Sequence, residues 1–249
     1  MKRFVSVILL LVMFHGYCYA ENSAGISSLL SDFLGLFRNQ QEEVTDLTHT
    51  EVVAELREMG IEVSDETVEK TEAWIASHQK EMSGIEFEDS SVKFASNLLM
   101  SIGMGKYDYD TGIWTPTSST VYAFDAEVYD IEHMYRLFLQ GVSAIVPGFE
   151  PTDIHESIEE NVDEGSMDGT YGKTTVSFVL NGNKYEHELR FMGDWFDDDA
   201  VNWINEILAQ KSFEHRLYEF YDWGQGLILL YGDDAVWEKM CDLIPQPEM

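Results

Sequence analysis

Cysteine is scarce in this chain of 249 residues, which holds only Cys18 and Cys241. Cys18 lies in a segment typical of a cleaved leader, so the working protein would keep one cysteine and no internal disulfide. Small secreted domains often depend on disulfides, so stability here must come from a hydrophobic core instead. Cys241 lies in a helical pattern, which favours a buried thiol over a nucleophile, although an odd cysteine could also pair between chains.

Basic residues are also few: 15 Lys and Arg stand against 46 Asp and Glu, a net charge of −31. Such a charge repels nucleic acid phosphates and anionic membrane surfaces, so neither is expected as a partner. It favours a cationic partner, which could be a basic protein, a polyamine or a divalent metal ion. Solubility in an exposed compartment would explain the same charge more simply. Because 45% of the residues are hydrophobic, the chain is not a disordered polyanion.

Long hydrophobic runs are missing as well. The run Phe4–Phe14 has about eleven residues, too few to cross a bilayer of about 30 Å. It follows Lys2 and Arg3 and leads to small residues at Ala20, which is typical of a secretory signal peptide. We therefore expect residues 1–20 to be removed, with Ala24 as an alternative cleavage point. The protein is then secreted, with no membrane span.

A lipid anchor on Cys18 is the competing interpretation of this leader. The residue before a lipidated cysteine is normally Gly or Ala, whereas Tyr17 stands here, so the anchor is disfavoured. Cleavage after Ala20 removes two basic residues and no acidic one. The secreted chain would therefore be even more acidic than the whole.

Motifs of the common enzyme classes are not present. There is no G-x-S-x-G elbow, no S-x-x-K with its companion motifs, no H-E-x-x-H and no cysteine pair with metal-ligand spacing. No strand–helix–strand alternation with Gly-rich turns suggests a nucleotide-binding fold. The sequence thus favours a protein that binds over one that catalyses, and it singles out no catalytic residue.

The N-terminal part has helical spacing up to about residue 105. Thr48 and Glu51 form a capping box before one of its helices. At Lys106 the pattern changes to short segments rich in β-branched and aromatic residues. We divide the chain into a helical region 21–105 and an α+β domain 106–249, which could fold together. The predicted helices cover residues 26–37, 48–60, 64–84 and 91–105.

Two β-hairpins are predicted in the C-terminal third. The alternating runs 174–180 and 185–191 flank Asn181-Gly182, the dipeptide that a type I′ turn requires. A second hairpin joins 213–221 to 227–231. Each is followed by a helix, one capped near Asp197 and one capped by Asp233. Asp198-Asp199-Ala200-Val201 and Asp233-Asp234-Ala235-Val236 match closely, which indicates either an internal repeat or two similar helix caps.

The middle of the chain completes the predicted fold. Short strands are expected over 113–115 and 121–126, and a helix capped by Asp130 over about 130–147. Residues 150–169 hold either a short surface helix, with Ile154, Ile158 and Val162 on one face, or a solvated loop. The fold class is therefore α+β: a helical N-terminal part followed by antiparallel hairpins with helices packed on one face.

Candidate site residues come from the hairpins and the acidic segment between them. His187 and His215 lie on apolar hairpin faces and could meet across strands, although core histidines are the simpler interpretation. Asp194 and Asp197 are the first candidates for a carboxylate-dependent hydrolase of glycans or peptides. Trp195 and Trp223 are candidate binding aromatics.

Calcium is the one cofactor that the acidic composition suggests, because hard cations prefer carboxylate oxygens. Asp108 and Asp110 resemble the start of a calcium loop, but Ser119 stands where an EF-hand needs a glutamate. A second candidate cluster is Asp197, Asp198 and Asp199. The leading hypothesis is a secreted, acidic, non-catalytic module for a basic protein, for example one that neutralises a basic toxin. The alternatives are the hydrolase and a calcium-stabilised surface protein.

Overall fold

The computed structural model describes residues 47–81, 90–108, 111, 113–128, 130–161, 170–222 and 224–246. The predicted signal peptide and the predicted helix over 26–37 lie outside these residues. The described part holds helices α3 to α8 and strands β1 to β8, with antiparallel pairing in three small sheets, so the α+β class is confirmed. None of the helices in the described part is both long and apolar enough to cross a membrane.

Three helices fill the N-terminal part of the described chain. The first is held by the predicted capping box: the Glu51 amide donates to Thr48 Oγ1 at 3.3 Å and the Thr48 amide donates to Glu51 Oε2 at 2.8 Å. The Ser90 hydroxyl caps the third by accepting from the Lys93 amide. The helices are α3 (His49–Glu58), α4 (Asp65–Glu81) and α5 (Ser91–Gly103).

A three-stranded sheet lies at the centre of the described part. Its order is β3 (Val121–Asp125), β8 (Gly226–Gly232) and β7 (Arg216–Tyr221), all antiparallel. Successive side chains point to opposite faces, and both faces are buried, so Leu227 and Ile228 enter different cores. This explains why β8 is a continuous apolar run, in contrast to the alternating pattern of a sheet covered on one side.

The second sheet is covered on one face, as expected. It consists of β4 (Thr152–Glu160), β5 (Gly172–Leu180) and β6 (Asn183–Phe191). The hairpin β5–β6 turns at Asn181 and Gly182, with φ of 51° and 74°, which confirms the predicted positive-φ turn. Along β6 the charged residues are exposed, whereas Leu189 and Phe191 enter the core.

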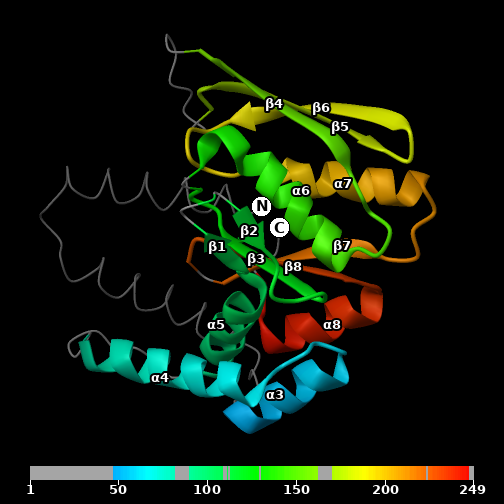
Figure 1. Ribbon diagram of the computed structural model, residues 1–249. Coiled ribbons are helices and arrows are strands. Elements are labelled where there is room, and N and C mark those ends of the chain that lie inside the picture. Colours follow the sequence, from blue (N-terminus) through cyan, green and yellow to red (C-terminus); the bar gives the residue numbers. More distant parts are fainter. Residues whose placement is uncertain are drawn as a thin grey trace, which may run out of the picture. The chain divides into compact units, whose positions relative to one another are not determined.

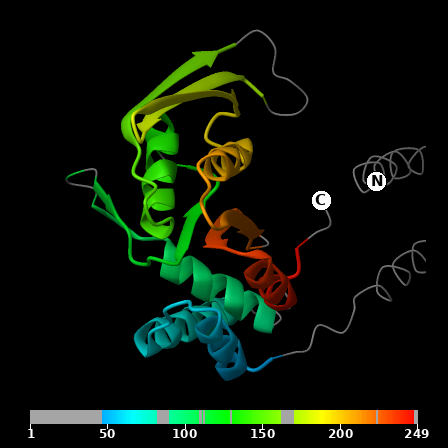
Figure 2. The same cartoon turned by 90° about the vertical axis from the view of Figure 1, so that its right-hand side faces the viewer.

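Helices separate and cover these sheets in layers. Figures 1 and 2 show α6 (Met134–Ile145) and α7 (Asp199–Gln210) between the sheet of β4–β6 and the central sheet. The other face of the central sheet is covered by α5 and α8 (Asp234–Leu243), and α3 packs on α5; the apolar residues of all three share one core with the sheet. A small ribbon of β1 (Lys106–Asp108) and β2 (Ile113–Thr115) completes the described fold.

The segment predicted as a helix or loop over 150–169 contains a strand, β4. Ile154 and Ile158 are four residues apart, and because four is even, this spacing also places them on one face of a strand. Both are half-buried. The strand is irregular at its start, where Asp153 has a φ of 50° and the pairing with β5 shifts register. Val162 lies outside the described residues.

The predicted cap at Asp130 is also wrong. Its carboxylate contacts the ring of His133 at 3.0 Å and caps no backbone amide. The helix α6 begins after a short 3-10 turn. Its cap is Glu156, which lies on the neighbouring strand β4 and is distant in sequence. The Tyr135 and Arg136 amides donate to the two Glu156 carboxylate oxygens at 3.0 and 2.6 Å.

Replacing this distant cap should destabilise the fold measurably. Glu156→Ala leaves two amides of a partly buried helix end without their acceptor, and we expect a loss of about 1–2 kcal/mol in the free energy of unfolding. Glu156→Gln keeps one acceptor oxygen and should lose less. Urea denaturation followed by circular dichroism measures both. Equal stability of Glu156→Ala and the unmodified protein would show that the cap is dispensable.

The two hairpin–helix units differ in topology. Each sheet has one strand outside its hairpin. In the sheet of β4–β6 this strand, β4, pairs with the first hairpin strand, β5, whereas in the central sheet β3 pairs with the second hairpin strand, β8. The matching acidic residues also differ in role. Asp233 caps α8 through the Val236 amide, whereas the Asp198 side chain makes no capping bond to α7. The different strand pairing thus argues against a duplicated unit, and the four matching residues do not form equivalent helix caps either.

Candidate binding site

The two candidate histidines belong to different sheets. His187 lies on β6, and its ring stacks on Trp203 of α7 with 5.1 Å between centroids. His215 directly precedes β7, and its ring meets the edge of Tyr231 at 5.4 Å. Each histidine thus packs on an aromatic neighbour of its own, and the structure does not bring them together across strands.

Asp197 is an internal anchor of the fold. It is 0% exposed, and its carboxylate accepts from the Arg190 amide at 2.8 Å and from the Arg190 guanidinium Nη2 at 2.5 Å. The Asp197 amide donates to the Tyr135 hydroxyl at 3.3 Å. These bonds join β6, α6 and the start of α7, and they leave the carboxylate little capacity for a substrate or a metal ion.

The acids beside Asp197 are less buried, and Asp198 also forms an ion pair with Arg190 at 3.6 Å. Asp198 accepts from the Tyr221 hydroxyl at 3.0 Å, and Asp199 is exposed at the first position of α7. Asp194 is exposed, and its carbonyl accepts from the Val128 amide. Among the described residues no group of three potential metal ligands lies together. A calcium site at Asp197, Asp198 and Asp199 stays a prediction, with the Asp197 carboxylate already bound to Arg190.

The other calcium candidate is only partly described. Asp108 accepts from the Thr111 amide at 3.2 Å, which closes the turn after β1. Asp110 lies outside the described residues. The structure therefore places the Asp108 carboxylate in a turn. Calcium binding at this loop stays a prediction.

Glu219 of β7 is a titratable group that the sequence pattern did not single out. One of its carboxylate oxygens is buried without a hydrogen-bond partner. Burial, followed by the nearby charges of Asp198 and Asp199, raises the pKa of Glu219 to about 7. The same surroundings raise the pKa of Tyr221, mainly through burial. A carboxyl group whose pKa is raised to about 7 thus lies near two other acidic side chains, Asp198 and Asp199.

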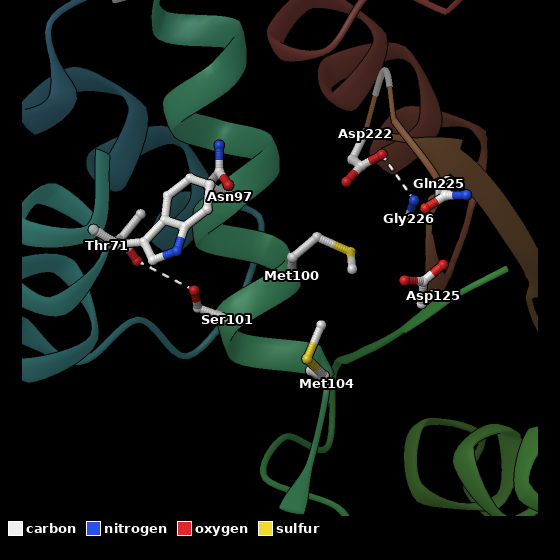
Figure 3. A pocket seen from close by; sticks show the side chains of 10 residues that line it. Thr71, Asn97, Met100, Ser101, Met104, Asp125, Asp222, Gln225 and Gly226 are labelled. Carbon is white, nitrogen blue, oxygen red and sulfur yellow. Dashed lines mark hydrogen bonds between the residues drawn. The ribbon is translucent and has the colours of Figure 1, made fainter. Parts of the chain in front are cut away.

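A hollow of about 430 Å³ lies between helices α4 and α5 and the β7–β8 turn. We call it the acidic hollow. In Figure 3, Met100 and Met104 lie between the side that holds Thr71 and Asn97 and the side that holds Asp125 and Asp222. Its lining residues are Thr71, Trp74, Asn97, Met100, Ser101, Met104, Asp125, Asp222, Gln225 and Gly226.

The two aspartates of the acidic hollow keep acceptor capacity. Asp222 closes the hairpin turn by accepting from the Gly224 and Gly226 amides at 2.7 and 2.9 Å, both through Oδ1. Asp125 accepts from the Glu127 amide through its Oδ1 at 3.0 Å. Neither carboxylate forms an ion pair with a residue that the structure describes. One side of the hollow therefore carries two carboxylates that no cationic side chain of the described part of the chain neutralises.

The predicted segment around Trp195 lies near this side. Glu127 pairs with Trp195 in an isolated bridge, and its carboxylate accepts from the Gln225 side chain at 2.7 Å. The Phe196 amide donates to the Ala126 carbonyl, and the Ala126 amide donates to the Gln225 carbonyl, both at 2.8 Å. The candidates Asp194 and Trp195 are thus linked through residues 126–128 to the turn that holds Asp222. Trp223 lies outside the described residues.

Sequence reasoning missed the helical wall of the acidic hollow. Met100 of α5 and Met104, which directly follows this helix, are one turn apart, whereas Leu98, Leu99 and Ile102 of α5 face the core. The signal in the sequence was an apolar stripe on α5 that is wider than packing against the core requires. A helix that is apolar on most sides does not reveal which side is covered.

Comparisons of the chain with protein-family models, with curated proteins and with solved structures found no match. The residues of the acidic hollow, with their charge and exposure, are therefore the basis for a functional proposal.

Proposed function

We propose that this chain is a secreted, acidic, non-catalytic interaction module that binds a cationic protein through the acidic hollow. One concrete form is a protein that neutralises a basic toxin. The observation that carries the proposal is the hollow itself, where the Asp125 and Asp222 carboxylates face an apolar wall formed by Met100, Met104 and Trp74.

The exposure of that wall supports a binding role. Five large hydrophobic side chains are exposed among the described residues, and Trp74 and Met104 of the acidic hollow are two of them, at 46% and 49%. Tryptophan and methionine are enriched in the buried centres of protein interfaces. A volume of 430 Å³ lies within the usual range of ligand sites, about 300–1,000 Å³.

The charge of the chain supports a cationic partner. A net charge of −31 produces a negative field that attracts a basic protein and repels an acidic one. Charge complementarity raises the association rate and selects the partner. At 0.1 M salt the attraction between exposed charges is largely screened beyond about 10 Å. The Asp125 and Asp222 carboxylates beside the apolar wall would then determine where on the protein the partner binds.

Capture experiments with the full chain at low and high salt test this proposal. Proteins retained at about 50 mM salt should be basic, and most should be lost at about 500 mM, because the Debye length falls severalfold over this range. Mass spectrometry identifies the retained proteins and their charge. Retention of acidic proteins, or retention indifferent to salt, would contradict a charge-guided module.

A hydrolase remains the second candidate, and the observation that favours it is the pair Glu219 and Asp198. Glycoside hydrolysis uses two neighbouring carboxyl groups, and the one with the raised pKa serves as the acid, as Glu219 could here. The pair replaces Asp194 and Asp197 as the place to look, since Asp197 is fully buried and bound to Arg190, whereas the Asp198 side chain is 47% exposed. Turnover of a glycan or peptide substrate that is lost in Glu219→Gln, with the fold intact, would favour the hydrolase over the binding module.

A further inference from the structure

Three different groups meet around Gly226 at the start of β8. The Gly226 amide donates to Asp222 Oδ1, and Asp125 is the residue paired with Gly226 on β3. A Cβ atom placed on Gly226 would be 2.4 Å from Asp222 Oδ2 and 2.8 Å from the sulfur of Met100. A carboxylate and a thioether are therefore close neighbours here, because this position has no side chain.

The apolar wall continues away from these acids. Met104 is the C-cap residue of α5, and its amide donates to the Met100 carbonyl, which places it one turn after Met100. Trp74 is three residues after Thr71 on α4, and both line the same hollow. A ligand that occupies the acidic hollow would thus meet negative charge at one end and exposed apolar groups at the other.

We infer that the acidic hollow binds an arginine together with an adjacent apolar side chain from a basic segment of the partner protein. The guanidinium lies between the Asp222 and Asp125 carboxylates, its methylene stem lies on Met100, and the apolar neighbour packs on Met104. This inference rests on the proposed function and adds to it the residues that the partner must present.

Arginine fits this arrangement better than lysine. Its planar group carries five N–H donors and can bond two carboxylates at once, that of Asp125 at the end of β3 and that of Asp222 in the β7–β8 turn, whereas the lysine ammonium is a compact, more strongly hydrated charge. The methylene stem of a basic side chain also covers apolar surface while its charged head stays at the polar end. The neighbouring apolar residue then excludes water from the carboxylates, which strengthens the charged hydrogen bonds.

Methionine methyl NMR of the full chain tests the inference with short synthetic peptides. The probe is a Gly/Ser peptide that carries one Arg-Leu pair, and its matched variants carry Lys-Leu, Arg-Ala or Gly-Leu. Met100→Leu and Met104→Leu assign the two signals. We expect the Arg-Leu peptide to shift the Met100 and Met104 methyls, and each replacement in the peptide to weaken binding by about threefold or more.

Aspartate variants of the protein provide a second test of the inference. Asp222→Asn and Asp125→Asn keep the amide oxygens that accept the turn hydrogen bonds and remove only the charge, and each should weaken Arg-Leu binding by about tenfold. Shifts confined to other methionines, equal binding of the Lys-Leu peptide, or no shift at millimolar peptide would overturn the inference. If a basic protein were still captured in a salt-dependent way, a charge-guided binding role would stand, but the acidic hollow would be wrong as its site.

Discussion

Asp197→Ala is expected to lower the free energy of unfolding by about 3 kcal/mol. The substitution removes the acceptor of the Arg190 amide and of its guanidinium from a site that is fully buried. Hydrogen bonds to charged groups contribute about 1.5–3 kcal/mol, and breaking a buried ion pair costs about 3–5. Arg190 is 44% exposed, so its charge can turn to water, which places the loss at the lower end.

Urea denaturation with a matched variant measures this effect. Asp194→Ala removes an equivalent charge from an exposed position nearby and should change stability by no more than about 0.5 kcal/mol. Asp197→Asn keeps one acceptor and should lie between the two. A loss below 1 kcal/mol in Asp197→Ala would mean that the buried pair is not a structural anchor and would return Asp197 to the list of functional candidates.

Glu219→Gln is expected to stabilise the protein by about 2 kcal/mol at pH 8 and to have little effect at pH 4. Burial raises the pKa of Glu219 from 4.5 to about 7 in the folded state. Between these values the folded protein binds more protons than the unfolded chain, so its stability falls as the pH rises through this window. Above pH 7 the buried carboxylate is charged and its cost remains, and glutamine removes that cost.

Thermal unfolding across pH 4–8 shows whether this holds. The difference in melting temperature between Glu219→Gln and the unmodified protein should grow from pH 4.5 to pH 7 and then stay constant. Glu214→Gln, at an exposed position, should show no such trend. Parallel curves for both variants, or a Glu219→Gln protein that is less stable at pH 8, would contradict a buried and uncompensated carboxyl group.

Local signals in the sequence predicted the elements that local chemistry determines. Asn181-Gly182 specifies its turn because both residues accept positive φ, and Thr48 with Glu51 satisfies the first amides of α3 within four residues. Errors arose where the partner is distant in sequence. Glu156 caps α6 in place of Asp130, and β4 depends on pairing with β5, neither of which a short window contains.

The sequence did not predict the residues that line the acidic hollow. The segment Asp194–Asp199 was singled out for its charge, but the structure uses Asp197 to hold Arg190 and places Asp194 and Trp195 beside the turn that contains Asp222. The acidic hollow combines residues from α4, α5, β3 and the β7–β8 turn, which span positions 71 to 226. Only the tertiary fold brings these residues together.

Binding of the captured basic protein to two matched double variants tests the central claim most directly. Asp125→Asn/Asp222→Asn and Asp153→Asn/Asp233→Asn remove the same charge, and Asp153 and Asp233 are exposed positions outside the lining of the hollow. At about 50 mM salt the first variant should bind at least about tenfold more weakly than the unmodified chain, and the second within about twofold. Equal weakening in both would show that net charge alone, and not the acidic hollow, binds the partner.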